Sequence, residues 1–155
     1  LIGRYAIGGG IGAIFYMEPI LTYDLDIFVF LPQTQSGLIV LSPIYESLRR
    51  KGHKVHREQI VVEGMPVQLI PAYNPLVEEA VREAREIRYG KTRTRVLRAE
   101  HLLAIMLQTG RPKDKARITQ MLEEARMDRD YLARILDRHG LNKRWREFKR
   151  QCYGT

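Results

Sequence analysis

Two aspartates separated by one apolar residue constrain this chain's fold more than any other feature. Asp24-Leu25-Asp26-Ile27 opens a run of β-branched and aromatic residues that predicts a strand over 24–30. Because side chains alternate along a strand, Asp24 and Asp26 point to one face, and Leu25 and Ile27 point to the core. Two adjacent carboxylates repel each other unless a cation such as Mg²⁺ or Mn²⁺ neutralises them. An edge strand with two solvated aspartates is the alternative.

A run of three glycines precedes this strand. Gly8, Gly9 and Gly10 follow a short apolar segment, 4–7, that predicts a buried strand, and they lead into a helix predicted over 11–17. Glycines at such a junction let the backbone approach a phosphate closely, and the exposed N–H groups favour an anion. A tight turn would use the same residues, so the run alone does not define a phosphate site.

The rest of the chain predicts alternating elements followed by helices only. We expect a polar loop over 32–37, a helix over 42–52, a hairpin of strands 55–62 and 65–70, a helix over 74–88, a strand within 90–96, and helices over 99–108, from 112, over 129–140 and over 142–152. The order β-α-β-α-β-β, then helices, predicts an α/β (α+β) fold in which a mixed sheet flanked by helices precedes a C-terminal helical bundle.

Charge divides the chain unevenly. Residues 1–81 carry 6 basic and 8 acidic side chains, whereas residues 82–155 carry 20 basic and 10 acidic ones. The order of the expected elements places a boundary between Arg88 and Arg98, so we expect a core domain over 1–90 and a basic helical domain over 91–155. Such a basic half is typical of proteins that bind nucleic acid or nucleotide phosphates, although an Arg-rich helical surface without such a partner has the same composition.

Cysteine content and hydropathy limit the possible location of the protein. No apolar run in the 155 residues approaches the roughly 18 needed to span a bilayer, so we expect no membrane partner. The single Cys152 excludes an internal disulfide and is compatible with the reducing cytoplasm.

At this point the sequence resembles a known family, the nucleotidyltransferase superfamily. The resemblance rests on Tyr5-Ala6-Ile7-Gly8-Gly9-Gly10, a spacer of 13 residues, and Asp24-Leu25-Asp26-Ile27. The segment Gly110-Arg111-Pro112-Lys113-Asp114, between two predicted helices, and Thr22, shortly before the first aspartate, are similar to the abortive-infection type. That type includes toxins of bacterial toxin–antitoxin pairs.

The resemblance implies a role for each matching residue. Asp24 and Asp26 would hold Mg²⁺ and carry catalysis. The residues implied to bind a nucleoside triphosphate are Gly8, Gly9, Gly10, Thr22, Arg111, Lys113 and Asp114. For 111–114 a plain helix start explains the same residues, with Pro112 at the first helical position and Asp114 favourably placed against the helix dipole.

The chain departs from the family at several positions. The family's third acid, which deprotonates the attacking hydroxyl, is replaced by Gln68, and glutamine is no base at neutral pH. Glu58 and Glu63 are near enough in sequence to be considered as substitutes. Further departures are Ile20 or Leu21 in place of an arginine, Met106 in place of a lysine and Arg117 in place of an acid.

These departures leave three functions open. The first is a divergent, Mg²⁺-dependent nucleotidyltransferase that transfers a nucleoside monophosphate to an RNA (tRNA included), protein or small-molecule acceptor. The second is a catalytically degenerate protein of the same fold that binds nucleotide or nucleic acid. The third is an interaction protein whose basic helices meet an acidic antitoxin partner.

Overall fold

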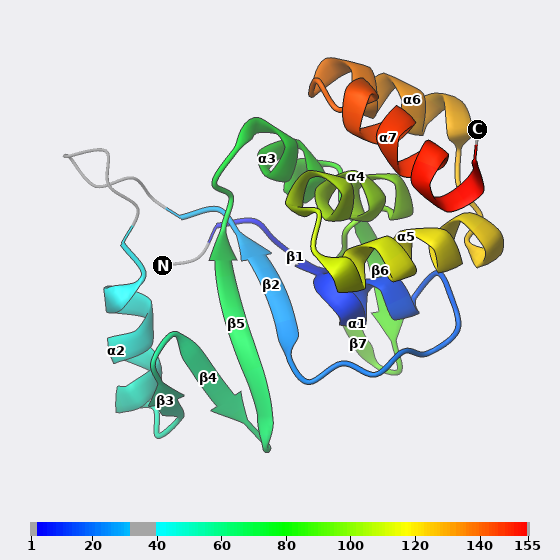
Figure 1. Ribbon diagram of the computed structural model, residues 1–155. Helices are drawn as coiled ribbons and strands as arrows, with labels where there is room; N and C mark the ends of the chain where they lie inside the picture. Colours follow the sequence, from blue (N-terminus) through cyan, green and yellow to red (C-terminus); the bar gives the residue numbers. More distant parts are fainter. Residues whose placement is uncertain (1–2, 32–39, 155) are drawn as a thin grey trace.

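The computed structural model describes residues 3–31 and 40–154, so the loop predicted over 32–37 lies outside the described residues. Strands and helices follow one another as expected for a mixed α/β chain (Figure 1). The elements are β1 (Tyr5–Gly8), α1 (Gly9–Ile14), β2 (Leu25–Val29), α2 (Ser42–Arg50), β3 (Lys54–His56), β4 (Gln59–Val62), β5 (Met65–Pro71), α3 (Pro75–Arg82), β6 (Arg85–Tyr89), β7 (Thr92–Val96), α4 (Ala99–Thr109), α5 (Pro112–Glu124), α6 (Arg129–Arg138) and α7 (Asn142–Tyr153).

The described strands form one mixed sheet in the order β3-β4-β5-β2-β1-β7-β6. The pairs β2–β5 and β1–β7 are parallel, and the other neighbouring pairs are antiparallel. The sheet, with its flanking helices, confirms the predicted fold class. The predicted division at residue 90 stays a prediction; β7, beyond that point, pairs with β1 in the same sheet.

Alternation along β2 sends its side chains to two different cores. Phe28 packs with α3 and α4 in the larger cluster, whereas Val29 packs with Ile44 and Tyr45 of α2 in a smaller cluster on the other face. Asp26, two residues before Phe28, therefore lies on the face that the larger group of helices covers. This face of the sheet carries the candidate site.

Helix α4 is the centre of the helical layer. Its residues from Ala99 to Leu107 are all buried, which is typical of a helix surrounded by other elements. Helices α3, α5, α6 and α7 pack around it (Figure 1). Although α4 is buried along most of its length, none of the helices in residues 3–31 and 40–154 has the length and hydropathy that a membrane span requires.

The structure corrects the helix predicted over 74–88. Helix α3 ends at Arg82, and Arg85–Tyr89 forms β6, which pairs antiparallel with β7 across a turn at Gly90. The Arg95 guanidinium donates hydrogen bonds to the carbonyls of Val81, Arg82 and Ala84 at 3.0–3.3 Å. These bonds satisfy carbonyls at the end of the helix, where the intrahelical ladder leaves them without partners.

Two further predictions were wrong in detail. The strand expected over 55–62 is two strands, β3 and β4, because Arg57 adopts a left-handed conformation with φ of 54° and turns the chain. The helix expected over 11–17 begins earlier, at Gly9, and ends at Ile14. The first change adds an edge strand to the sheet, and the second brings the start of α1 against β2.

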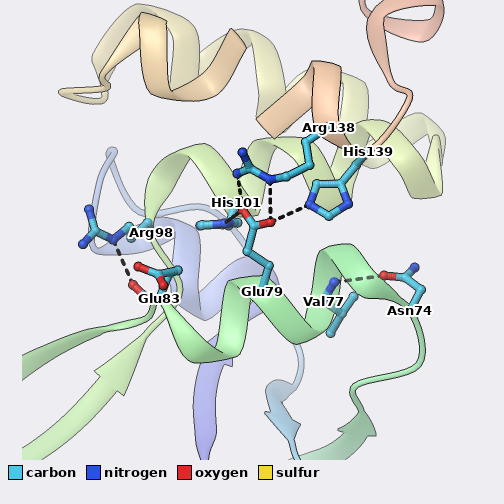
Figure 2. A network of polar contacts seen from close by, with 8 residues as sticks. All are labelled: Asn74, Val77, Glu79, Glu83, Arg98, His101, Arg138 and His139. Atoms are coloured by element: carbon cyan, nitrogen blue, oxygen red, sulfur yellow. Dashed lines mark hydrogen bonds and ion pairs between the residues drawn. The ribbon is translucent and has the colours of Figure 1, made fainter. Parts of the chain in front are cut away.

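Glu79 of α3 joins three parts of the helical layer, as Figure 2 shows. The Arg138 guanidinium donates two hydrogen bonds to its carboxylate at 2.7 and 2.9 Å, and His101 Nε2 and His139 Nε2 lie 3.1 and 2.8 Å from it. These contacts lower the pKa of Glu79 to about 2, with the hydrogen bonds from Arg138 as the largest cause. The ionised carboxylate thereby ties α3 to α4 and to the end of α6.

Candidate active site

A pocket of about 200 Å³ opens where the aspartates, the glycine bend and the start of α5 meet. Its lining is partly polar and partly apolar. The polar lining residues are Gly9, Asp24, Asp26, Gln68, Tyr73, Thr109, Arg111, Lys113, Asp114 and Arg117; the apolar ones are Phe28, Ile70, Leu97, Leu102, Ile105 and Met106. The pocket thus combines residues that are more than 80 positions apart in the sequence.

Asp24 and Asp26 both line this pocket. Asp26 is the second residue of β2, and Asp24 lies immediately before the strand. Burial raises the pKa of Asp26, and the nearby Asp24 carboxylate raises it further, while Arg111, Lys113 and Arg117 act in the opposite direction. A cation between the two carboxylates would relieve their repulsion.

The glycine bend lies directly against the aspartates. Gly9 has φ of 58°, and a Cβ at this position would contact the Oδ2 atom of Asp26. A Cβ on Gly10 would lie 2.8 Å from Thr22 Oγ1 and 3.1 Å from a guanidinium nitrogen of Arg117. Gly8 packs differently, because a Cβ there would meet the ring of Phe28 and a methyl group of Leu97, which belong to the apolar part of the pocket lining.

Thr22 supports the chain just before the first aspartate. Its hydroxyl donates a hydrogen bond of 3.3 Å to the backbone carbonyl of Asp24, and its side chain is half-buried against Gly10. Thr22 does not itself line the pocket. Its contacts are with Asp24 and the glycine bend.

Arg111 and Asp114 form an ion pair at the start of α5. Asp114 is fully buried and accepts hydrogen bonds from Arg111 Nε at 2.7 Å, from a second guanidinium nitrogen at 3.2 Å and from the Arg111 backbone N–H at 3.3 Å. The Arg111 side chain remains half exposed, and its pKa is raised first by Asp114 and also by Asp26 and Asp24. Asp114 therefore fixes a guanidinium beside the aspartate pair.

Arg117 belongs to the same pocket, although its sequence position suggested only a departure from the family. It lies four residues after Lys113 on α5, so the two cations share a helix face. Within the described part of the chain, neither the Lys113 nor the Arg117 side chain makes a hydrogen bond or an ion pair. The helical spacing from Lys113 is the signal that could have placed Arg117 in the site.

Gln68 stands beside Asp26 in the sheet. The two residues are register partners in the parallel pair β2–β5, and both line the pocket. Glu58 and Glu63, the substitutes considered for the missing acid, do not line it. Glu58 lies instead beside α2, where its backbone carbonyl accepts a hydrogen bond from the Tyr45 hydroxyl.

The donor set suits one kind of metal site. Among residues 3–31 and 40–154, no group of three or more His, Cys, Asp or Glu side chains could hold a metal ion. Asp24 and Asp26 supply two carboxylates to the pocket, and the third carboxylate of the lining, Asp114, is paired with Arg111. Mg²⁺ is commonly held in this way, by one or two carboxylates completed by water and substrate phosphates.

Comparison with known proteins gives a match in structure but none by family profile or to a curated protein. A solved structure does match: an antigenic nucleotidyltransferase-like protein from Paracoccidioides brasiliensis, with a TM-score of 0.57 and 13% sequence identity, over 94% of this chain and 84% of that one. The chain has a nucleotidyltransferase-type fold. At 13% identity this match establishes the shared fold alone.

The pocket of this nucleotidyltransferase-type fold brings together polar residues from both strands and helices. Three strands, β1, β2 and β5, bring the glycine bend, the aspartates and Gln68 to one place, and α5 adds its cations. Carboxylates and cations in the same pocket can hold a metal and a polyphosphate together. The arrangement can therefore accept a metal-bound phosphate chain.

Proposed function

We propose that this protein is a Mg²⁺- or Mn²⁺-dependent nucleotidyltransferase, which transfers a nucleoside monophosphate from a nucleoside triphosphate to an acceptor. The observation that carries the proposal is the pocket shared by Asp24, Asp26, Gly9 and the cations of α5. Carboxylates for a metal and cations for phosphates then lie in one pocket. The similarity in fold is consistent with this reaction class.

Each residue has a defined task in this proposal. Gly9, the glycine of the bend that lines the pocket, presents its backbone to the triphosphate, and Gly10 continues the bend behind it. Arg111, Lys113 and Arg117 neutralise the charge of the triphosphate. Asp24 and Asp26 hold the metal, which when bound polarises the transferring phosphorus and neutralises charge on the phosphates. Asp114 keeps Arg111 oriented through their buried ion pair.

The basic C-terminal half supports an anionic acceptor or partner. Helix α7 presents four cations around a surface depression, Lys143, Arg146, Lys149 and Arg150, together with one acid, Glu147. RNA, including tRNA, or an acidic protein such as an antitoxin would be attracted to this helix. The single Cys152 is exposed and suits a reducing compartment, which supports a cytoplasmic location.

Label transfer tests the proposal directly. The protein is incubated with each α-³²P-labelled nucleoside triphosphate in turn, Mg²⁺, total RNA and a small-molecule extract. We expect transfer by the wild type, loss of at least about 100-fold in Asp24→Asn and Asp26→Asn, and unchanged transfer in Asp130→Asn, an exposed residue of α6 that serves as the control. Wild-type activity in both pocket variants would rule out the mechanism.

A second function is favoured by one observation, the amide of Gln68 beside Asp26. If transfer of the nucleoside monophosphate requires an acid at position 68, the protein binds nucleotide without turnover. Calorimetry would then detect Mg²⁺-dependent binding of a nucleoside triphosphate with no labelled product under any condition. Any product that depends on Asp26 excludes this alternative.

A further inference from the structure

Gln68 places a neutral hydrogen-bond donor where it can meet the incoming acceptor. Its register partner on β2 is Asp26 and its register partner on β4 is Gln59. Neighbouring strands are about 4.8 Å apart, so the side chain lies within reach of a group bound at the aspartate pair. Gln68 is half-buried, and no hydrogen bond within the described residues occupies its side chain.

The described pocket has no side chain free to remove a proton from a hydroxyl. Asp114 is buried and fully engaged by Arg111, and Asp24 and Asp26 are committed to the cation in the proposed function. Gln68 and Thr109 contribute an amide and an aliphatic hydroxyl, neither of which acts as a base. The segment 32–39 reads PQTQSGLI, so its sequence contains no acidic residue or histidine that could serve.

The same pocket is well suited to an anionic acceptor. A carboxylate at position 68 would add a third negative charge and repel an oxyanion, whereas the Gln68 amide can donate N–H bonds to one. Lys113 and Arg117 of α5 supply positive charge in the same pocket. The arrangement thus disfavours a hydroxyl acceptor and favours an acceptor that needs no deprotonation.

We infer that the acceptor in the proposed reaction is an oxyanion already ionised at neutral pH, a phosphate monoester or a carboxylate, and that Gln68 determines this specificity. The inference rests on the proposed function. One oxygen of the acceptor attacks the α-phosphorus and forms a new O–P bond. The bond from that phosphorus to the bridging oxygen of the β-phosphate breaks, and pyrophosphate leaves with the electron pair. No proton is transferred.

A binding experiment separates this inference from the proposed function. The protein is first saturated with Mg²⁺ and a mixture of the four α,β-methylene nucleoside triphosphates, which do not react, and is then titrated with inorganic phosphate or with acetate. We expect the wild type to bind at least one of these two probes, and the stronger one identifies the acceptor class. Gln68→Glu weakens that binding by about 10-fold or more through charge repulsion.

Gln59→Glu is the matched control, because it adds the same charge on the next strand but outside the pocket lining. It should leave binding of the probe unchanged. If neither oxyanion binds, or if Gln68→Glu binds as well as the wild type, the inference is wrong. Failure of the triphosphate analogues to bind in the first step would instead contradict the proposed function.

The bond in the reaction product gives a second readout. Transfer to a phosphate yields a diphosphate linkage, transfer to a carboxylate yields an acyl phosphate cleaved by hydroxylamine, and transfer to a hydroxyl yields a simple phosphodiester. If the acceptor is a phosphate monoester, labelling by the wild type should be lost after the RNA and small-molecule acceptors are treated with phosphatase. If the acceptor is a carboxylate, labelling should be lost after carboxylates are blocked. Gln68→Glu should gain transfer to hydroxyls by about 10-fold or more. The inference would be wrong if the wild type transferred label to hydroxyl acceptors as well as to oxyanion acceptors.

Discussion

The backbone of Gly9 lies directly against the carboxylate of Asp26, so that no side chain fits between them. Replacement of Gly9 by alanine should therefore displace Asp26. We expect Gly9→Ala to weaken Mn²⁺ and nucleotide binding by at least about 10-fold and to lower the free energy of unfolding by about 1 kcal/mol, because φ is positive at this position. Calorimetry and urea unfolding measure the two effects.

Gly90→Ala separates backbone strain from the contact with Asp26. Gly90 has φ of 60°, close to the 58° of Gly9, but nothing lies within 4 Å of its Cβ position. This variant should lose similar stability and keep full binding. Equal binding by the two variants would mean that Gly9 is not needed to position Asp26.

The ion pair at the start of α5 predicts different effects for two neighbouring cations. Arg111→Ala leaves the buried Asp114 carboxylate without its partner, so we expect a loss of about 2–3 kcal/mol in the free energy of unfolding. Lys113→Ala, at an exposed side chain, should cost less than about 0.5 kcal/mol. Both variants should weaken binding of a nucleoside triphosphate. Unchanged stability in Arg111→Ala, measured by urea unfolding, would contradict the structural role of the pair.

Glu79 should make the fold sensitive to acid. Its pKa is about 2 in the folded protein against an ordinary 4.5, so the stability that it contributes is present above about pH 4.5 and is lost as the pH falls towards 2. Burial lowers the pKa of His101, which adds a loss of stability as the pH falls below its ordinary value of 6.5. Both shifts act in the same direction.

Glu79→Gln tests this account of acid sensitivity. We expect it to lower the free energy of unfolding by about 2 kcal/mol near neutral pH, with a much smaller difference from the wild type near pH 3. Glu78→Gln, the neighbouring acid on α3 outside the network, is the control. Urea unfolding at several pH values measures the difference. A pH-independent difference would show that ionisation of Glu79 does not stabilise the fold.

The basic surface of α7 predicts salt-dependent binding of RNA. Reversal of two charges in Arg146→Glu/Arg150→Glu should weaken RNA binding by at least about 10-fold and reduce the dependence of affinity on salt. Arg49→Glu/Arg50→Glu makes the same change in charge at the end of α2 and should have little effect. Filter binding at two salt concentrations distinguishes them. An equal loss in both double variants would indicate only a general effect of net charge.

Local signals in the sequence predicted much of the fold. The Asn74-Pro75 pair predicted the start of α3, and the structure places the Asn74 side chain as acceptor for the backbone N–H of Val77. The end of that helix was wrong because it depends on distant groups: Arg95 caps the carbonyls, and pairing with β7 draws Arg85–Tyr89 into the sheet. Neither contact leaves a mark in the local pattern of apolar residues.

The candidate site was predictable only in part for a similar reason. Alternation along one strand predicted that Asp24 and Asp26 share a face, and both line the pocket. The role of Arg117 depends on how α5 lies across the sheet, and the place of Gln68 depends on the register of β2 with β5. Such relationships between distant elements are set by tertiary packing.

Metal binding tests the central claim most directly. Electron paramagnetic resonance would follow the binding of Mn²⁺ to the wild type and to Asp24→Asn/Asp26→Asn, each in the presence of a nucleoside triphosphate analogue, with circular dichroism to verify the fold. The account predicts that the wild type binds Mn²⁺ together with the nucleotide and that the folded double variant binds it at least about 100-fold more weakly. Equal Mn²⁺ affinity in the two proteins would contradict the account.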